Sequence, residues 1–129
     1  MNSRNIVVIL FITLATFLAA GCSNPVMDIE ESPILVSGKY SAKDVRKAII
    51  RAGTSLGWRV KDIKPGHLEA TLLIREHMAK VDIFYDKKKY SIKYKDSSNL
   101  NYDGSNIHHR YNTWVRNLDR RIQAQLATL

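Results

Sequence analysis

The sequence predicts a small α+β domain with the chain order helix, four-stranded antiparallel meander, helix. The expected architecture is a two-layer sandwich, with the sheet as one layer and both helices as the other. Two stretches with helical spacing of apolar residues flank a middle stretch in which apolar and polar residues alternate. The connections within the middle stretch are short, so neighbouring strands must run antiparallel. Because the sheet and both helices each have one apolar side, we expect both helices to cover one face of the sheet. The predicted domain is single and spans 40–129.

The first helix is expected to begin after Ser41. Asp44 stands three residues later, which is the spacing of a capping box, and its charge suits a helix N-terminus. Gly57 is placed to end the helix as a left-handed cap. The apolar residues between these signals recur at steps of three and four, and they are Val45, Ala48, Ile49, Ala52 and Leu56.

Four strands are expected from Trp58 onward, where the helical period gives way to alternation. Their ranges are 58–64, 68–75, 79–85 and 90–95. Pro65-Gly66 is a turn signal between the first two strands, and 86–89 forms a hairpin loop between the last two.

A polar, turn-rich loop over 96–106 leads to the second helix, which is expected to run from about Ile107 to Leu126. Its apolar stripe is Ile107, Tyr111, Trp114, Val115, Leu118, Ile122 and Leu126. The aromatic residues on inward positions of the strands and this helix are expected to pack in the core, and they are Trp58, Tyr85, Tyr90, Tyr94, Tyr111 and Trp114.

The N-terminal segment has the organisation of a secretory signal, with one charge at Arg4 followed by an uncharged apolar run over 6–18. A permanent membrane span is the weaker interpretation, because a spanning helix needs about 20 apolar residues. The following Leu18-Ala19-Ala20-Gly21-Cys22 resembles the lipobox of bacterial lipoproteins, although Ala19 stands where Leu is most common. The resemblance implies that 1–21 is a signal peptide and that Cys22, the only cysteine, carries lipid.

The residues after Cys22 bear on sorting and on the connection to the domain. Gram-negative lipoproteins with Asp after the cysteine stay in the inner membrane, so Ser23 implies the inner leaflet of the outer membrane, facing the periplasm. The segment 22–39 holds Pro25 and Pro33 with little periodicity and is expected to be a lipidated, irregular tether. Ile34-Leu35-Val36 is compatible with either a short strand or the end of this tether.

Charge points to an anionic partner. Removal of the leader takes away one Arg and no acid, so the formal charge falls from +8 to +7. Such a balance often indicates nucleic acid, but export excludes that expectation and leaves an acidic envelope protein or an anionic lipid. The possible partner-binding residues on the uncovered sheet face are Arg59, Lys61, Leu73, Arg75, Lys80, Phe84, Lys93 and Lys95. Leu73 and Phe84 are either scattered surface residues or neighbours in a docking patch.

No metal, cofactor or catalytic residue is predicted. The four histidines, at 67, 77, 108 and 109, contain no pair at the four-residue spacing of helical ligands, so turn and surface roles are expected. The loop 96–103 is rich in oxygen ligands but lacks the calcium-loop spacing, which favours turn and cap roles. The chain also lacks a G-x-S-x-G motif and a nucleophilic cysteine, so an enzyme is the third alternative.

The C-terminal half carries a second resemblance. The segments are Tyr90-Ser-Ile-Lys-Tyr-Lys-Asp-Ser-Ser-Asn-Leu-Asn-Tyr-Asp-Gly104 and Ile107-His-His-Arg-Tyr-Asn-Thr-Trp-Val-Arg-Asn-Leu118. With the lipobox, they resemble a family of small uncharacterised proteobacterial lipoproteins with an Asp-Ser-x-Asn-Leu loop and an Ile-His-x-x-Tyr-Asn-x-Trp helix. The resemblance implies location and fold, and it implies no activity. The expected function is a non-enzymatic binding or envelope-assembly accessory, and the alternative is a lipopolysaccharide or lipid-transport accessory.

Overall fold

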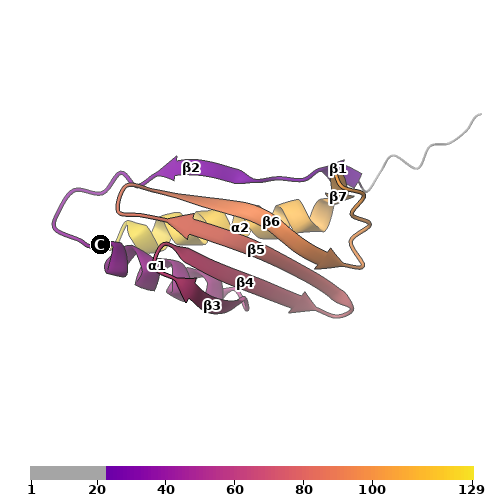
Figure 1. Cartoon of the computed structure of the whole chain (residues 1–129), viewed down its shortest axis with the longest axis horizontal. Helices are drawn as coiled ribbons and strands as arrows, with labels where there is room; N and C mark the ends of the chain where they lie inside the picture. The colour runs from indigo at the N-terminus through magenta and orange to yellow at the C-terminus, as the bar shows by residue number, and fades with distance from the viewer. Residues whose placement is uncertain (1–22) are drawn as a thin grey trace, which may run out of the picture.

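The computed structural model describes residues 23–129 (Figure 1). It contains two helices, a five-stranded antiparallel sheet and a separate two-stranded antiparallel sheet. The predicted α+β class is therefore confirmed. The predicted signal peptide and Cys22 lie outside the described residues. Within 23–129, no helix is both long enough and apolar enough to cross a membrane.

The large sheet has the strand order β2-β6-β5-β4-β3 (Figure 1). Its consecutive strands are β3 (Arg59–Lys64), β4 (His67–Ile74), β5 (His77–Tyr85) and β6 (Lys89–Ser98). The fifth strand, β2 (Ile29–Pro33), pairs with β6 at the edge of the sheet. The prediction of a four-stranded sheet is wrong in this respect, because β2 comes from the segment that was expected to be a tether.

The prediction of an irregular tether over 22–39 is also wrong for residues 23–34, because this segment contains two paired strands. β1 (Ser23–Pro25) pairs with β7 (Asn106–His108), and β2 pairs with β6 through a bulge. Tyr94 donates its backbone N–H to Asp28 Oδ1 at 2.9 Å, and Ile34 donates its own to the carbonyl oxygen of Lys88 at 2.7 Å. Ile34 is buried just beyond β2, which ends at Pro33, so the Ile34-Leu35-Val36 run is not a strand.

The helix α1 (Ala42–Ser55) begins as its sequence predicts. Ser41 donates its backbone N–H to Asp44 Oδ2 at 2.8 Å, and Asp44 donates its N–H to Ser41 Oγ at 3.3 Å, which completes the capping box. The hydrogen bonds from Ser41 lower the pKa of Asp44. Gly57 follows the helix with a φ of 88°, in the left-handed region that the chain needs in order to turn there.

The helix α2 (His109–Leu126) begins two residues later than expected, because Ile107 belongs to β7. His108 caps it, accepting a hydrogen bond at Nδ1 from the backbone N–H of Arg110 at 3.1 Å. The helix ends at Leu126, as its apolar stripe predicts.

One core joins the helices and the large sheet. α1 contacts α2, β3 and β5, and buried residues of both helices belong to the same apolar cluster as the inward residues of β4, β5 and β6. The fit is close where α1 meets β3, because a Cβ added at Gly53 would lie 2.8 Å from Val60 Cγ2. Among the expected core aromatics Trp58, Tyr85, Tyr90 and Tyr111 are buried, while Tyr94 and Trp114 are partly buried.

Candidate functional site

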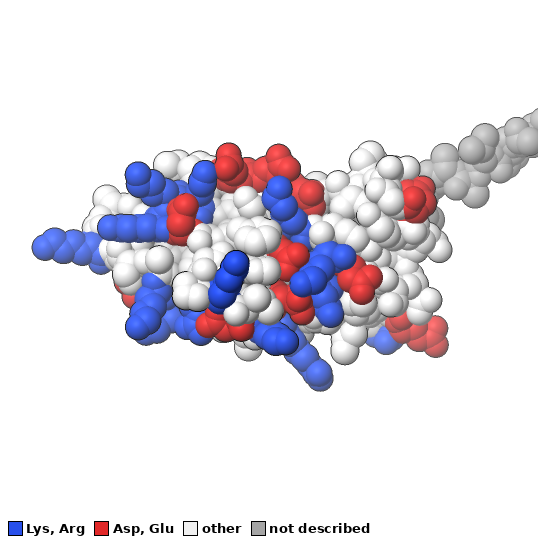
Figure 2. All heavy atoms as spheres, in the orientation of Figure 1, with Lys and Arg blue, Asp and Glu red and all other residues white. Residues whose placement is uncertain are grey.

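The first candidate is the outward face, which we define as the side of β3 to β6 opposite the buried alternating residues. The predicted residues lie on or beside it. β3 carries Arg59 and Lys61, β4 carries Leu73, the β4–β5 turn carries Arg75, β5 carries Lys80 and Phe84, and β6 carries Lys93 and Lys95. Figure 2 shows Lys and Arg interspersed with Asp and Glu on the side where the sheet stands in front. The face is therefore mixed in charge.

Glu69 on β4 organises the centre of the outward face. Lys95 Nζ donates to Glu69 Oε2 at 2.6 Å and lies 3.4 Å from Asp82 Oδ1, while Lys80 Nζ lies 3.8 Å from Glu69 Oε1. The hydrogen bond from Lys95 lowers the pKa of Glu69, and the same contact raises the pKa of Lys95. Two of the lysines assigned to partner binding are thus already paired with acids of the same chain.

His67 extends this network toward the β3–β4 turn. Its Nε2 lies 2.7 Å from Asp82 Oδ1, and its ring stacks on Phe84 with the centroids 4.5 Å apart. The side chains of His67 and Asp82 are 16% and 19% exposed, so both are largely covered although they lie on the outward face.

The rim of the outward face contains both paired and free cations. Lys93 Nζ lies 3.6 Å from Glu30 Oε1, an acid on β2 that the sequence places in a tether. Within 23–129, Arg59, Lys61 and Arg75 form no ion pair. The unpaired positive charge of the face is therefore concentrated on edge strand β3 and at the β4–β5 turn.

Leu73 and Phe84 do not form a common patch. They are 57% and 41% exposed, but the register pairs Leu73 with Met78 and Phe84 with His67. Leu73 and His67 are six positions apart along β4, which is about 20 Å at 3.3 Å per residue. The interpretation of these two residues as neighbours in one docking patch is wrong, because Leu73 lies beside the β4–β5 turn and Phe84 lies at the other end of β5, opposite His67.

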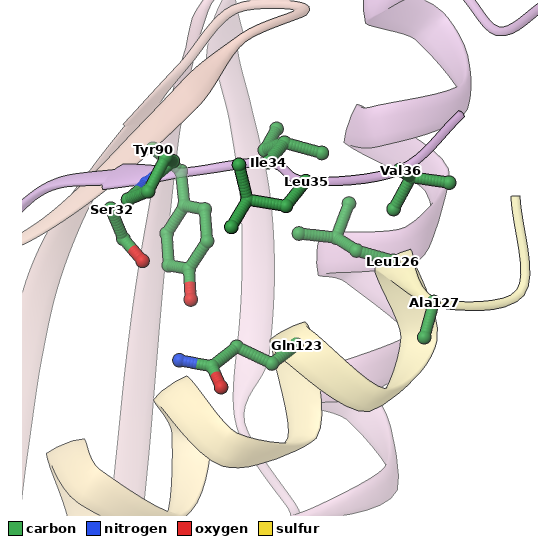
Figure 3. Close-up of a pocket in the computed structure, with 9 residues that line it drawn as sticks. Ser32, Ile34, Leu35, Val36, Tyr90, Gln123, Leu126 and Ala127 are labelled. Carbon is green, nitrogen blue, oxygen red and sulfur yellow. The ribbon is translucent and has the colours of Figure 1, made fainter. Parts of the chain in front are cut away.

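The second candidate is a cavity of about 390 Å³ between the chain that follows β2 and the C-terminal turn of α2 (Figure 3). Figure 3 shows Ile34, Leu35 and Val36 on one side, and on the other Gln123 and Leu126 of α2 with Ala127, which follows the helix. The complete lining is Ser32, Pro33, Ile34, Leu35, Val36, Tyr90, Gln123, Leu126 and Ala127. Leu35 is 88% exposed, so an apolar side chain faces solvent beside an apolar hollow.

Three polar side chains, Tyr90, Asp119 and Gln123, meet at one side of the cavity. The hydroxyl of Tyr90 points toward α2 and donates to Asp119 Oδ1, and Gln123 Nε2 donates to Asp119 Oδ2 at 3.1 Å. Burial and the hydrogen bond to Asp119 raise the pKa of Tyr90 to about 12. The phenol therefore stays protonated in the neutral range, and the apolar walls of the cavity meet a polar corner in which Tyr90 and Gln123 both donate to Asp119.

Lysines surround the same end of the molecule, which we call the hairpin end and define as 34–40, 86–89 and 126–129. Lys39, Lys87 and Lys88 are exposed there. The backbone carbonyl of Lys88 accepts from Ile34, and that of Lys87 accepts from the Tyr40 hydroxyl at 3.0 Å, so the hairpin is tied to the cavity wall. The cavity therefore lies next to exposed positive charge.

The histidines show no arrangement typical of metal binding in the part of the chain that the structure describes. His108 and His109 have ring centroids 4.4 Å apart, and His77 lies beside Trp114 at 6.4 Å. Burial, followed by the charges of His109, Arg110 and His77, lowers the pKa of His108. Among residues 23–129, no group of three or more His, Asp or Glu side chains could hold a metal ion.

The sequence does not single out the cavity. Its signals are present, because Ile34-Leu35-Val36 is an apolar run and 87–89 is a run of lysines, but only the pairing of β2 with β6 brings them together. Comparisons of the chain with models of protein families, with curated proteins and with solved structures found no significant match. The two candidates therefore rest on geometry.

Proposed function

We propose that the chain is a non-enzymatic lipoprotein accessory of the bacterial envelope that binds an anionic lipid. In this proposal lipid on Cys22 anchors it to the inner leaflet of the outer membrane, and the domain faces the periplasm. The N-terminal sequence supports the anchor, and the apolar cavity beside the lysine-rich hairpin supports the ligand class.

The cavity suits one acyl chain of a lipid. Its apolar walls remove hydrocarbon from water, which stabilises binding by about 25 cal/mol per Å² of apolar surface. A phosphate at the mouth would lie near Lys87 and Lys88, which are exposed on the adjoining hairpin. Apolar walls with cations at the rim match a molecule that has a hydrocarbon tail and an anionic head.

A cavity-filling substitution tests the lipid site. Ala127→Trp places a large side chain in the cavity wall just after α2, while Ala124→Trp changes an exposed alanine within α2 that is outside the lining. Titration with a short-chain phosphatidylglycerol below its micelle concentration should show binding by wild type and by the Ala124→Trp control. Binding should be lost in Ala127→Trp. Equal affinity of all three proteins would refute the cavity as the site.

The lysines contribute a separable electrostatic part. Reversal of Lys87 and Lys88 to Glu should weaken the binding about tenfold or more, since each charge near a phosphate contributes on the order of 1 kcal/mol at the surface. The effect should shrink with added salt. Reversal of Lys61 on β3 is the control, because this exposed lysine lies on the edge strand far from β2 in the sheet order.

A second candidate partner is an acidic envelope protein on the outward face. The observation in its favour is that Arg59 and Lys61 lie on edge strand β3 without an ion pair among the described residues. This proposal requires the two-layer arrangement, in which both helices cover one face of the sheet and leave the outward face open to a partner. Alternating burial in β4 and β5 supports it, as do both helices standing behind the sheet in Figure 1. Capture of acidic proteins that survives reversal of Arg59 and Lys61 would refute it.

A further inference from the structure

We propose that the mature domain stands directly on the phospholipid headgroups, without a spacer, and holds its cavity at the end far from the membrane that anchors it. The surface in contact with the headgroups is the anchor end, which we define as the β4–β5 turn, the loop 99–105 and the β7–α2 junction. This inference rests on the proposed attachment of lipid at Cys22 and adds an orientation to it.

No flexible linker separates the anchor residue from the first strand, because β1 begins at Ser23. Ser23 is already in β1, in register with His108, and adjacent Cα atoms are about 3.8 Å apart. The residue that bears the thiol is therefore joined directly to an ordered strand. Asn112 Nδ2 donates to the Pro25 carbonyl oxygen at 2.8 Å, and the Met27 N–H donates to Asn112 Oδ1 at 2.9 Å. These bonds hold the first residues to the core of α2.

The parts of the anchor end are joined to one another. His77 Nδ1 lies 2.8 Å from the carbonyl oxygen of Asn99, and Asn99 Nδ2 donates to the carbonyl oxygen of Glu76 at 2.6 Å. His108 donates its N–H to the carbonyl oxygen of Leu100 at 2.8 Å, and Val26 donates to that of Ser105 at 3.0 Å. Hydrogen bonds therefore join the turn, the loop and the strand that follows the anchor into one continuous surface.

The chemistry of this surface fits phospholipid headgroups. Arg75 and Arg110 are exposed cations that can meet phosphates, and Glu76 and Asp103 are exposed acids that can meet amines. Tyr102 is 42% exposed and stacks on Tyr94 with the centroids 4.2 Å apart. An amphipathic aromatic side chain at the surface is favoured at the level of the headgroups.

The cavity lies at the end of α2 that is far from the anchor end. α2 begins at the anchor end and reaches the cavity at Leu126, and its 18 residues span about 27 Å at 1.5 Å per residue. Figure 1 shows β1 and β7 at one end of the molecule and the C-terminus at the other. The Debye length is about 8 Å at physiological salt, so the charge of the anchoring membrane is screened at the hairpin end. The cavity then lies roughly 27 Å from the anchor end, so in this proposal its ligand is supplied from the periplasmic side.

The test uses the single thiol as the point of attachment. The mature chain, 22–129, contains every described element and is coupled through Cys22 to a maleimide lipid in vesicles of phosphatidylethanolamine and phosphatidylglycerol. Hydrogen exchange is compared with that of uncoupled protein mixed with the same vesicles. Amides of the β4–β5 turn and of 101–105 should exchange at least threefold more slowly, and those of 35–40 and 86–89 should not change.

A spacer variant provides the matched control. Insertion of 20 Gly and Ser residues between Cys22 and Ser23 adds a flexible reach of about 25 Å, so the protection of the anchor end should disappear. Protection at the hairpin end, equal exchange at both ends, or protection that survives the insertion would overturn the inference. The chemical coupling makes this result independent of whether cells attach lipid to Cys22, which is measured separately on protein isolated from cells.

Discussion

Asn112 on α2 donates a hydrogen bond of 2.8 Å to the carbonyl oxygen of Pro25 on β1, and the two residues are 87 positions apart in the chain. The same amide accepts from the Met27 N–H at 2.9 Å. Asn112 is 6% exposed, and it is one of the two buried polar residues among those described. One buried side chain thus connects the segment that follows Cys22 to the long helix.

Replacement of Asn112 should release this segment. Asn112→Ala removes both hydrogen bonds and should lower the free energy of unfolding by about 1–2 kcal/mol, because one donor and one acceptor lose their partners. Hydrogen exchange at Val26 and Met27 should accelerate more than exchange in β5. The control is Asn117→Ala, an exposed asparagine of the same helix, which should leave both quantities unchanged. Unaltered exchange at Met27 in Asn112→Ala would contradict the assigned role.

The pairing of Glu69 with Lys95 predicts an acid-sensitive contribution to stability. The pKa of Glu69 is lowered in the folded protein, so the unfolded chain binds more protons in the window just below the ordinary value of 4.5. Stability is therefore present above pH 4.5 and is lost as the pH falls through the lowered pKa. Because Lys95 is 40% exposed, the contribution should not exceed about 1 kcal/mol.

The Glu69→Gln variant checks this contribution. Its free energy of unfolding, measured by urea denaturation between pH 3 and pH 7, should fall less on acidification than that of wild type. Identical pH profiles of the two proteins would show that the contact with Lys95 adds nothing to stability.

The raised pKa of Tyr90 predicts that the free energy of unfolding falls at alkaline pH. Its pKa of about 12 in the folded protein exceeds the unfolded value of about 10, so the stability it contributes is complete below pH 10 and is lost as the pH rises toward 12. This loss should be on the order of 2 kcal/mol. Tyr90→Phe should decline less between pH 9 and pH 11, with some loss remaining because burial also raises the pKa of Tyr111. A decline equal to that of wild type would contradict the assignment.

Gly53 marks the tightest contact between α1 and β3. Gly53→Ala gains about 1 kcal/mol of helix propensity, but its Cβ would lie 2.8 Å from Val60 Cγ2, and overpacking costs about 1–3 kcal/mol. We expect a net loss of about 1 kcal/mol in denaturant unfolding. The double variant Gly53→Ala, Val60→Ala should be less destabilised than the sum of the single variants. Additive effects would show that the two positions do not compete for space.

The parts of the fold that local signals encode could be predicted. The capping box of Ser41 and Asp44, the apolar spacing of α1 and the alternation in β4, β5 and β6 each lie within a few residues of sequence. The α+β class follows from them. Local signals place the start of α2 too early, because Ile107 pairs with Asn24 in the small sheet and that partner is distant in the chain.

The N-terminal strands could not be predicted because their partners are far away. β2 contains Pro33, has Glu31 at a φ of 46° and pairs through a bulge, so it shows no alternation. Its acid Glu30, which lies near Lys93, was therefore missed. For the centre of the outward face, alternation alone places Glu69, Lys80 and Asp82 on one side, but only the strand register shows that Lys95 is within reach of both acids.

Attachment of lipid at Cys22 is the premise of both the proposed function and the proposed orientation on the membrane. The direct measurement is mass spectrometry of the protein isolated from envelope membranes after expression of the full chain in a Gram-negative host. We predict a chain that begins at Cys22 and carries acyl chains on that residue, and no such species from a Cys22→Ala variant. An intact Met1 together with an unmodified thiol would contradict the proposal.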